Sequence, residues 1–227
     1  MFFDSTFLIL IPGVLLAFYA QWKVRSTYNR YLEVPASVGL TGAEVAARIL
    51  ARRGAPNVKV EPVEGMLSDH YDPRGKVLRL SPENYYGHSI AALGVSAHEA
   101  GHAIQDAEGY RWLVVRSAMV PVANIGSNLA WILFMIGLFF AQFRVLMDVG
   151  ILLFTGAVLF SIITLPVEFD ASRRAVAVLG GEGLVTPRES EGVQAVLNAA
   201  ALTYVAAAAM AVLQLLRLIM LRNSREE

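Results

Sequence analysis

Four long runs without a charged residue constrain the fold of this chain most strongly. They cover residues 5–22, 117–143, 149–167 and 192–216. Each is close to or above the roughly 18 residues that a helix needs to cross a bilayer. A hydrophobic share of 56% also fits a membrane protein. We therefore predict four transmembrane helices, which span 1–22, 118–143, 147–167 and 198–221.

Basic residues beside these runs predict a multi-pass protein of the cell inner (plasma) membrane. Lys and Arg gather on the cytoplasmic side of such proteins. One side carries Lys23, Arg25, Arg30, Arg111, Arg116, Arg173 and Arg174, whereas the other carries Arg144, Arg222 and Arg225. We expect the richer side to face the cytoplasm and both termini to face outward. No basic residue precedes the first run and no small-x-small site follows it, so we interpret it as an uncleaved anchor.

Charge and cysteine content exclude two classes of site. The 19 basic residues balance the 19 acidic residues, so nothing in the net charge favours a nucleic-acid partner. The chain has no cysteine, which excludes disulfides and thiolate metal ligands.

The sequence His-Glu-Ala-Gly-His at 98–102 places two imidazoles one turn apart on one face of a helix. At that spacing both rings can reach one Zn²⁺ at about 2.0–2.1 Å. Glu99 lies beside the first histidine, where it can act on a water molecule at the metal. Ser89 as a cap and Gly109 as a stop predict a helix over 89–107. A chance pair of histidines on an amphipathic helix is the alternative.

A third metal ligand must come from outside this helix. His88 lies ten positions before His98, about 15 Å along a helix, and cannot share a metal with it. Glu168 directly follows the third run on the same predicted side of the membrane. With His98 and His102 it would complete a His₂Glu site with one open position for water. Asp170 is a rival ligand, and a simple helix-terminal acid is the alternative for Glu168.

Shorter signals predict a small α+β region between the first two runs. A capping box at 41–44 opens a helix. Alternating residues predict a strand over 58–63, and a good turn sequence at 72–75 predicts a hairpin of 66–71 and 76–80. The hairpin directly precedes the predicted helix over 89–107, which carries the two histidines and is called the metal helix below. The edge of the hairpin could therefore hydrogen-bond an extended substrate backbone.

A metal-bound water that attacks a peptide carbonyl forms a tetrahedral intermediate with an oxyanion. A hydrogen-bond donor besides the metal would stabilise that oxyanion. His70 and Tyr71 stand beside the hairpin turn, and we favour them as donors; His70 is also an alternative third ligand. A surface histidine and tyrosine on a loop is the competing interpretation. Tyr204 in the fourth run is another donor candidate, or an interfacial tyrosine.

Four segments resemble the bacterial YugP-type neutral zinc metallopeptidases, over nearly the whole chain. They are Asp-His-Tyr-Asp-Pro at 69–73, His-Glu-Ala-Gly-His-Ala-Ile-Gln at 98–105, Pro-Val-Ala-Asn-Ile-Gly-Ser-Asn at 121–128, and Leu-Pro-Val-Glu-Phe-Asp-Ala-Ser-Arg-Arg at 165–174. The resemblance implies a membrane-embedded zinc-dependent protease. It also implies a more distant similarity to the HtpX and CAAX prenyl protease group.

The resemblance also implies roles for individual residues. His98 and His102 match the histidine ligands, Glu99 the catalytic base, and Glu168 the third ligand. The wider group has an aspartate four residues after that glutamate, where this chain has Ser172. Asp170 is the candidate to replace that aspartate.

Together these observations predict a mainly α fold. It is a four-helix transmembrane bundle with a small α+β zincin-like domain, of the minimal gluzincin type, that carries a short hairpin. The catalytic domain covers 23–117, and a cytoplasmic helical segment at 168–197 supplies the third zinc ligand.

The predicted function is that of a zinc endopeptidase, with Zn²⁺ as cofactor and its catalytic domain on the cytoplasmic side. Membrane or juxtamembrane protein substrates and the lipid bilayer are the expected partners, and further partner proteins and homo-oligomers stay open. The alternative is a non-catalytic membrane scaffold or regulator on a metallopeptidase fold. That alternative has no need of the acid at Glu99.

Overall fold

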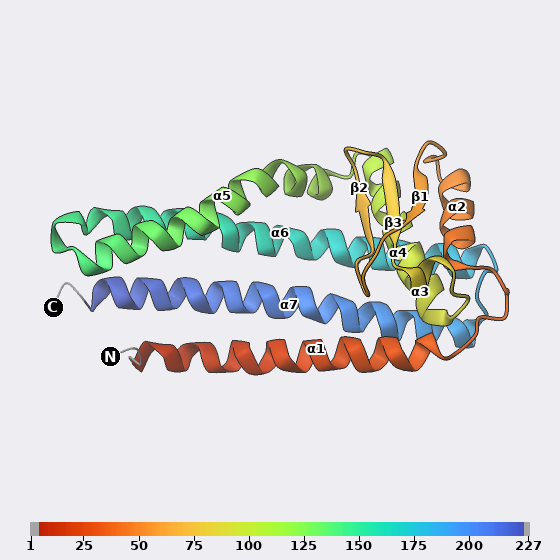
Figure 1. Cartoon of the computed structure of the whole chain (residues 1–227), viewed down its shortest axis with the longest axis horizontal. Coiled ribbons are helices and arrows are strands. Elements are labelled where there is room, and N and C mark those ends of the chain that lie inside the picture. Colours follow the sequence, from red (N-terminus) through yellow and green to blue (C-terminus); the bar gives the residue numbers. More distant parts are fainter. Residues whose placement is uncertain (1–4, 225–227) are drawn as a thin grey trace. The chain divides into compact units, whose positions relative to one another are not determined.

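The computed structural model describes residues 5–224, so Arg225 and the start of the predicted span 1–22 lie outside it. The structure is mainly helical, with one small sheet (Figure 1). The chain divides into two compact units. The apolar-helix unit comprises the described residues of 1–21, 114–165 and 203–227, and the sheet unit comprises 22–113 and 166–202.

Four helices in the described range 5–224 are long and apolar enough to cross a membrane, which confirms the expected number of apolar helices. They are α1 (Ile11–Leu32), α5 (Arg111–Phe139), α6 (Val145–Gly181) and α7 (Pro187–Asn223). A 3-10 helix, η1 (Ser5–Leu10), precedes α1, and a second, η2 (Ala141–Phe143), separates α5 from α6. Each long helix extends past its uncharged run on at least one side and contributes residues to both units.

Small residues allow close helix packing in the apolar-helix unit. A Cβ atom at Gly150 on α6 would lie 2.7 Å from the Ala130 carbonyl oxygen on α5. Only glycine permits that approach, as is common between membrane helices. The packed side chains around it include Phe134, Met147 and Phe154.

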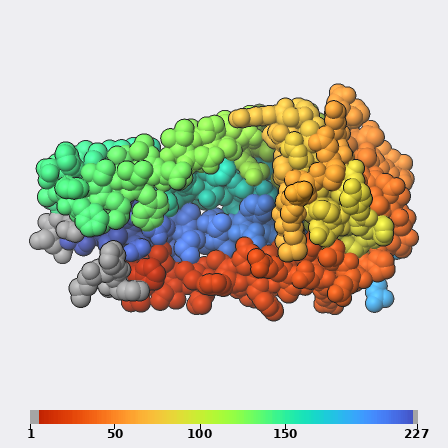
Figure 2. All heavy atoms as spheres, in the orientation of Figure 1, coloured from red at the N-terminus to blue at the C-terminus, as the bar shows by residue number. Residues whose placement is uncertain are grey.

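The sheet unit contains the short elements. Helix α2 (Gly42–Arg52) begins at the predicted capping box, in which the Thr41 hydroxyl accepts from the Glu44 amide and the Glu44 carboxylate accepts from the Thr41 amide. Strand β3 (Val77–Leu80) pairs in parallel with β1 (Lys59–Pro62) and antiparallel with β2 (His70–Asp72). The order β1-β3-β2 leaves β2 at one edge. The strands form part of the viewed surface of this unit (Figure 2).

The hairpin is present, but its first strand is shorter than predicted. We expected a strand from 66 to 71, whereas β2 begins at His70. Gly65 and Leu67 have positive φ angles of 103° and 57°, which do not fit a strand. The Asp69 carboxylate instead accepts hydrogen bonds from the Ser81 amide and the Asn84 side chain. Local side-chain bonds of this kind compete with strand pairing.

The core of the sheet unit holds the metal helix in place. Helix α3 (Pro82–Tyr85) leads into α4 (Ile90–Ala107), which packs against α2 and the strands. Fully buried Leu78 and Leu80 of β3 meet Leu93 of α4 in this core. Burial of each such side chain contributes about 1.5–3 kcal/mol.

Candidate metal centre

Helix α4 presents two histidines on one face. The Ser89 hydroxyl accepts from the Ala92 amide at the start of the helix, as the cap signal predicted. Gly109 has a φ of +63° just beyond its end. The rings of His98 and His102 lie one turn apart, with their centroids 4.8 Å from each other.

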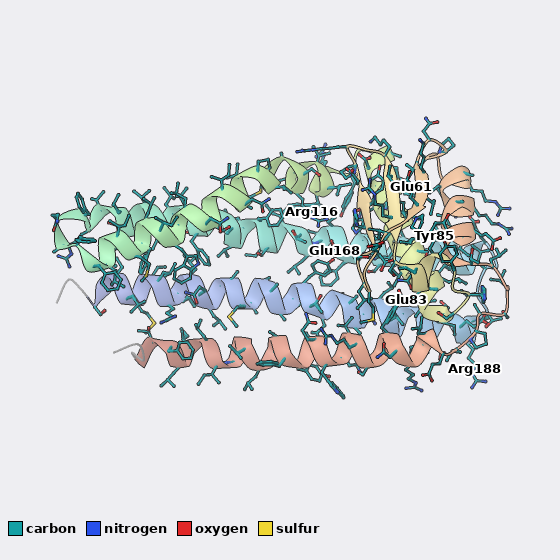
Figure 3. The ribbon with its side chains drawn as sticks, in the orientation of Figure 1. Glu61, Glu83, Tyr85, Arg116, Glu168 and Arg188 are labelled. Atoms are coloured by element: carbon teal, nitrogen blue, oxygen red, sulfur yellow. The ribbon has the colours of Figure 1, made fainter. Side chains whose placement is uncertain are left out.

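Glu168 of α6, labelled in Figure 3, lies within reach of both histidines. Its Oε2 atom lies 3.3 Å from His98 Nε2 and 3.5 Å from His102 Nε2. Among the described residues, these three side chains form the group that could hold a metal ion, with one ligand atom from each and all three within 4.8 Å of one another. The structure therefore brings together the three ligands predicted from the sequence.

The donor set fits zinc, and so do the two separations between Glu168 and the histidines. Two imidazole nitrogens and one carboxylate oxygen are the donors of catalytic His₂Glu sites. A tetrahedral Zn²⁺ with bonds of about 2.0–2.1 Å holds neighbouring ligand atoms about 3.3–3.4 Å apart. The separations of the Glu168 oxygen from the two imidazole nitrogens, 3.3 and 3.5 Å, agree with that edge, and all three ligand atoms lie within 4.8 Å of one another.

The remaining nitrogen of each histidine has its own partner. Ser172 Oγ lies 3.1 Å from His98 Nδ1, and Gln105 Oε1 lies 3.0 Å from His102 Nδ1. The histidines are thus oriented from both sides, as metal-binding histidines usually are. Ser172, which departs from the pattern of the wider group, itself contacts the ligand.

Asp170 lies near the candidate ligands, but its carboxylate is bonded to other side chains. Its carboxylate accepts from Gln105 Nε2 at 3.0 Å and forms ion pairs with Arg173 and Arg174. Among the described residues, the side chains that lie close enough together to share a metal ion are His98, His102 and Glu168, and Asp170 is not one of them. The geometry therefore favours Glu168 as third ligand over its rival.

Glu99 is buried close to the three candidate ligands. Only 8% of the residue is exposed, and its carboxylate accepts no hydrogen bond from another side chain or amide in residues 5–224. Burial raises the pKa of the Glu99 carboxyl, and the adjacent His98 and His102 offset part of this effect. A raised carboxyl pKa suits a group that must both accept and release a proton near neutral pH.

Gly101 has a structural reason to be glycine. A Cβ atom at this position would lie 2.8 Å from the Ala171 carbonyl oxygen of α6. The backbone of α6 occupies the space into which a side chain at this position would point. Because Gly101 precedes His102 and Ala171 follows Glu168 by three residues, we expect this close approach to influence the spacing of the three candidate ligands.

His70 and Tyr71 form their hydrogen bonds with residues other than the three candidate ligands. His70 is exposed, with Nδ1 2.8 Å from the Ser68 carbonyl and Nε2 3.3 Å from an Arg79 nitrogen. The Tyr71 hydroxyl donates to the Asp106 carboxylate at 2.6 Å. Neither side chain bonds to His98, His102 or Glu168 among the described residues. Their role as oxyanion donors stays a prediction.

Sequence reasoning missed Gln105. It is a fully buried polar residue that lies one helical turn after His102, and its side chain contacts α6. Its position three residues after a ligand histidine was a usable signal, because residues at that spacing are neighbours on a helix.

Comparison with known proteins shows the family to which the chain belongs. Residues 6–223 match the model of a family described as "Putative neutral zinc metallopeptidase". The chain belongs to this family. It is also 49% identical over 220 residues to the "Putative membrane protease YugP" of Bacillus subtilis (strain 168), which covers 96% of this chain and 97% of that protein. The resemblance found in the four sequence segments is thereby confirmed. No solved structure matches the chain.

Proposed function

We propose that this protein is a membrane-embedded zinc endopeptidase with a zincin-like site. One observation carries the proposal: His98, His102 and Glu168 converge to within 4.8 Å, and the buried acid Glu99, which has no hydrogen-bond partner within residues 5–224, lies close to them. A structural zinc site has no need of such an acid, whereas hydrolysis requires a base. When bound, zinc would polarise the scissile carbonyl and lower the pKa of a water molecule to about 7.

The side chains then have separate tasks. Glu99 accepts a proton from the attacking water, whose oxygen adds to the carbonyl carbon. When the C–N bond breaks, Glu99 passes that proton to the leaving nitrogen. Ser172 and Gln105 keep the two imidazoles in place during both steps. General acid–base catalysis of this kind typically contributes about 10²–10⁴-fold.

The edge of the sheet supports an extended peptide as substrate. Strand β2 is an edge strand and packs on α4, which carries Glu99. Edge strands present unpaired amides and carbonyls, to which an extended chain can add as a further strand. Asp69, held by Ser81 and Asn84, anchors the start of this edge.

The position of Glu168 in the chain supports substrates from the membrane. It directly follows the uncharged run 149–167, and the metal helix ends a few residues before α5 begins. With the orientation predicted from flanking arginines, the site would act on the cytoplasmic side. Membrane proteins or their juxtamembrane segments are the substrates we propose.

The test compares membranes from cells that carry either the wild type or Glu99→Gln. The amide is nearly isosteric but cannot act as a base. We expect new protein N-termini, mapped by mass spectrometry near transmembrane segments, in the wild type only. Identical sets of N-termini would contradict the proposed activity.

A further inference from the structure

Gln105 occupies a position between the two helices that carry the metal ligands. It is fully buried and lies on α4 with His98 and His102. Its amide nitrogen donates to the Val167 carbonyl at 2.9 Å and to Asp170 Oδ2 at 3.0 Å, both on α6 beside Glu168. Its amide oxygen faces His102 Nδ1 at 3.0 Å.

The hydrogen-bond chemistry of these partners permits one orientation of the amide. A backbone carbonyl can only accept, and Asp170 is an ionised acceptor because Arg173 and Arg174 form ion pairs with it. Both protons of the Gln105 amide are therefore used on α6. A flipped amide would set its oxygen against two acceptors, so the usual ambiguity of glutamine amides does not arise here.

This orientation determines which nitrogen of His102 can bind a metal. The Gln105 oxygen can only accept, so His102 Nδ1 must carry a proton and donate it. The lone pair of Nε2, on the side of Glu168, is then the one available for coordination. The second ligand histidine differs, because the Ser172 hydroxyl at His98 can donate or accept and imposes no such choice.

We propose that Gln105 is a positioning residue that fixes the protonation pattern and orientation of His102. Asp170 and its two arginines hold Gln105 in the required orientation. The proposal rests on the metal centre of the proposed function but not on its proteolytic activity. It assigns Asp170 a role in preparing a ligand rather than in binding the metal.

The first experiment measures zinc affinity of the full-length protein in detergent by competition with a chelator. Gln105→Leu keeps the side-chain volume and removes all three hydrogen bonds. We expect its zinc affinity to fall by about 10–100-fold, the usual effect of losing such a partner. Ser172→Ala is the matched control at the other histidine and should lose less. Unchanged affinity in Gln105→Leu would overturn the proposal.

A paired exchange separates hydrogen bonding from packing. Gln105→Glu alone sets a carboxylate against Asp170 and the Val167 carbonyl, so we expect weak zinc binding. Adding Asp170→Asn provides an amide donor to that carboxylate, which can still accept from His102 Nδ1. The double variant should recover part of the lost affinity. A further loss on adding Asp170→Asn would contradict the proposed direction of the hydrogen bonds.

The coordination of His102 in the wild type can be measured directly, and variants are needed only for assignment and comparison. The chain has four histidines, so selective ¹⁵N-histidine labelling gives few signals. His70→Ala and His88→Ala identify the two outside the site. In the zinc-loaded wild type we expect His102 to bind zinc through Nε2 and to keep a slowly exchanging proton on Nδ1. In Gln105→Leu that proton should exchange faster. Coordination of His102 through Nδ1 would overturn the proposal. Both readouts concern zinc and protons, so failure of the protease proposal would leave them interpretable.

Discussion

Replacing Gly101 with alanine tests how the packing of α4 on α6 controls the metal centre. The new Cβ atom would lie 2.8 Å from the Ala171 oxygen and 3.3 Å from two further backbone atoms, whereas ordinary contact begins at 3.4 Å. The α6 backbone must therefore retreat by about 0.6 Å (3.4 minus 2.8). Alanine gains about 1 kcal/mol of helix propensity, but overpacking typically costs about 1–3 kcal/mol. We expect a net loss of roughly 0–2 kcal/mol in the free energy of unfolding.

The effect on zinc should exceed the effect on stability. A shift of about 0.6 Å would widen the 3.3 and 3.5 Å separations between ligand atoms to roughly 4 Å. That is wider than the edge of a tetrahedral zinc site, about 3.3–3.4 Å. Chelator competition should therefore show clearly weaker zinc binding in Gly101→Ala, with thermal unfolding measured in parallel.

Gly180→Ala is the matched control for this variant. Gly180 lies on α6 in the same unit and has no atom within 4 Å of its Cβ position. It should gain helix propensity, about 0.5–1 kcal/mol, with zinc affinity unchanged. Zinc binding by Gly101→Ala equal to that of the wild type would refute the argument that helix approach sets the ligand spacing.

Three further predictions concern the ligands, the membrane and the hairpin. Metal analysis should find about one zinc per wild-type chain, none in His98→Ala and less in Glu168→Ala; full retention in Glu168→Ala would point to Asp170 or His70 as third ligand. In intact cells an impermeant thiol reagent should label Ser224→Cys but not Asn57→Cys, both exposed positions in a chain without native cysteine, and the reverse would overturn the cytoplasmic orientation. If His70 donates to the oxyanion, His70→Ala should lower kcat by about 10²–10³ with zinc content unchanged; unchanged turnover would make it a surface residue.

Features that depend on nearby residues were predictable from the sequence. Ser89 and Gly109 bound the metal helix because caps and left-handed glycines act within a few residues of a helix end. The two histidines followed from helical spacing alone. Glu168 needed the charge pattern and the family resemblance as well, because it lies 66 positions after His102.

Features that depend on contacts between distant segments were not predictable. The sequence pattern of 66–71 fits a strand, yet Asp69 binds Ser81 and Asn84 and ends the pairing at His70. The spacing of Gln105 from His102 indicates their local contact, but its partners on α6, Val167 and Asp170, become visible only once the two helices are packed. The need for glycine at position 101 was also not predictable, because it comes from the close approach of the Ala171 backbone on α6.

The most direct test of the zinc peptidase assignment is hydrolysis by the purified protein. A membrane protein identified from the N-terminus comparison would be incubated with zinc-loaded wild type or Glu99→Gln at equal zinc content. We expect the wild type to cleave it at the site seen in cells and the variant to be slower by about 10²–10⁴-fold. Cleavage by Glu99→Gln at the wild-type rate, with zinc bound to both proteins, would contradict the account.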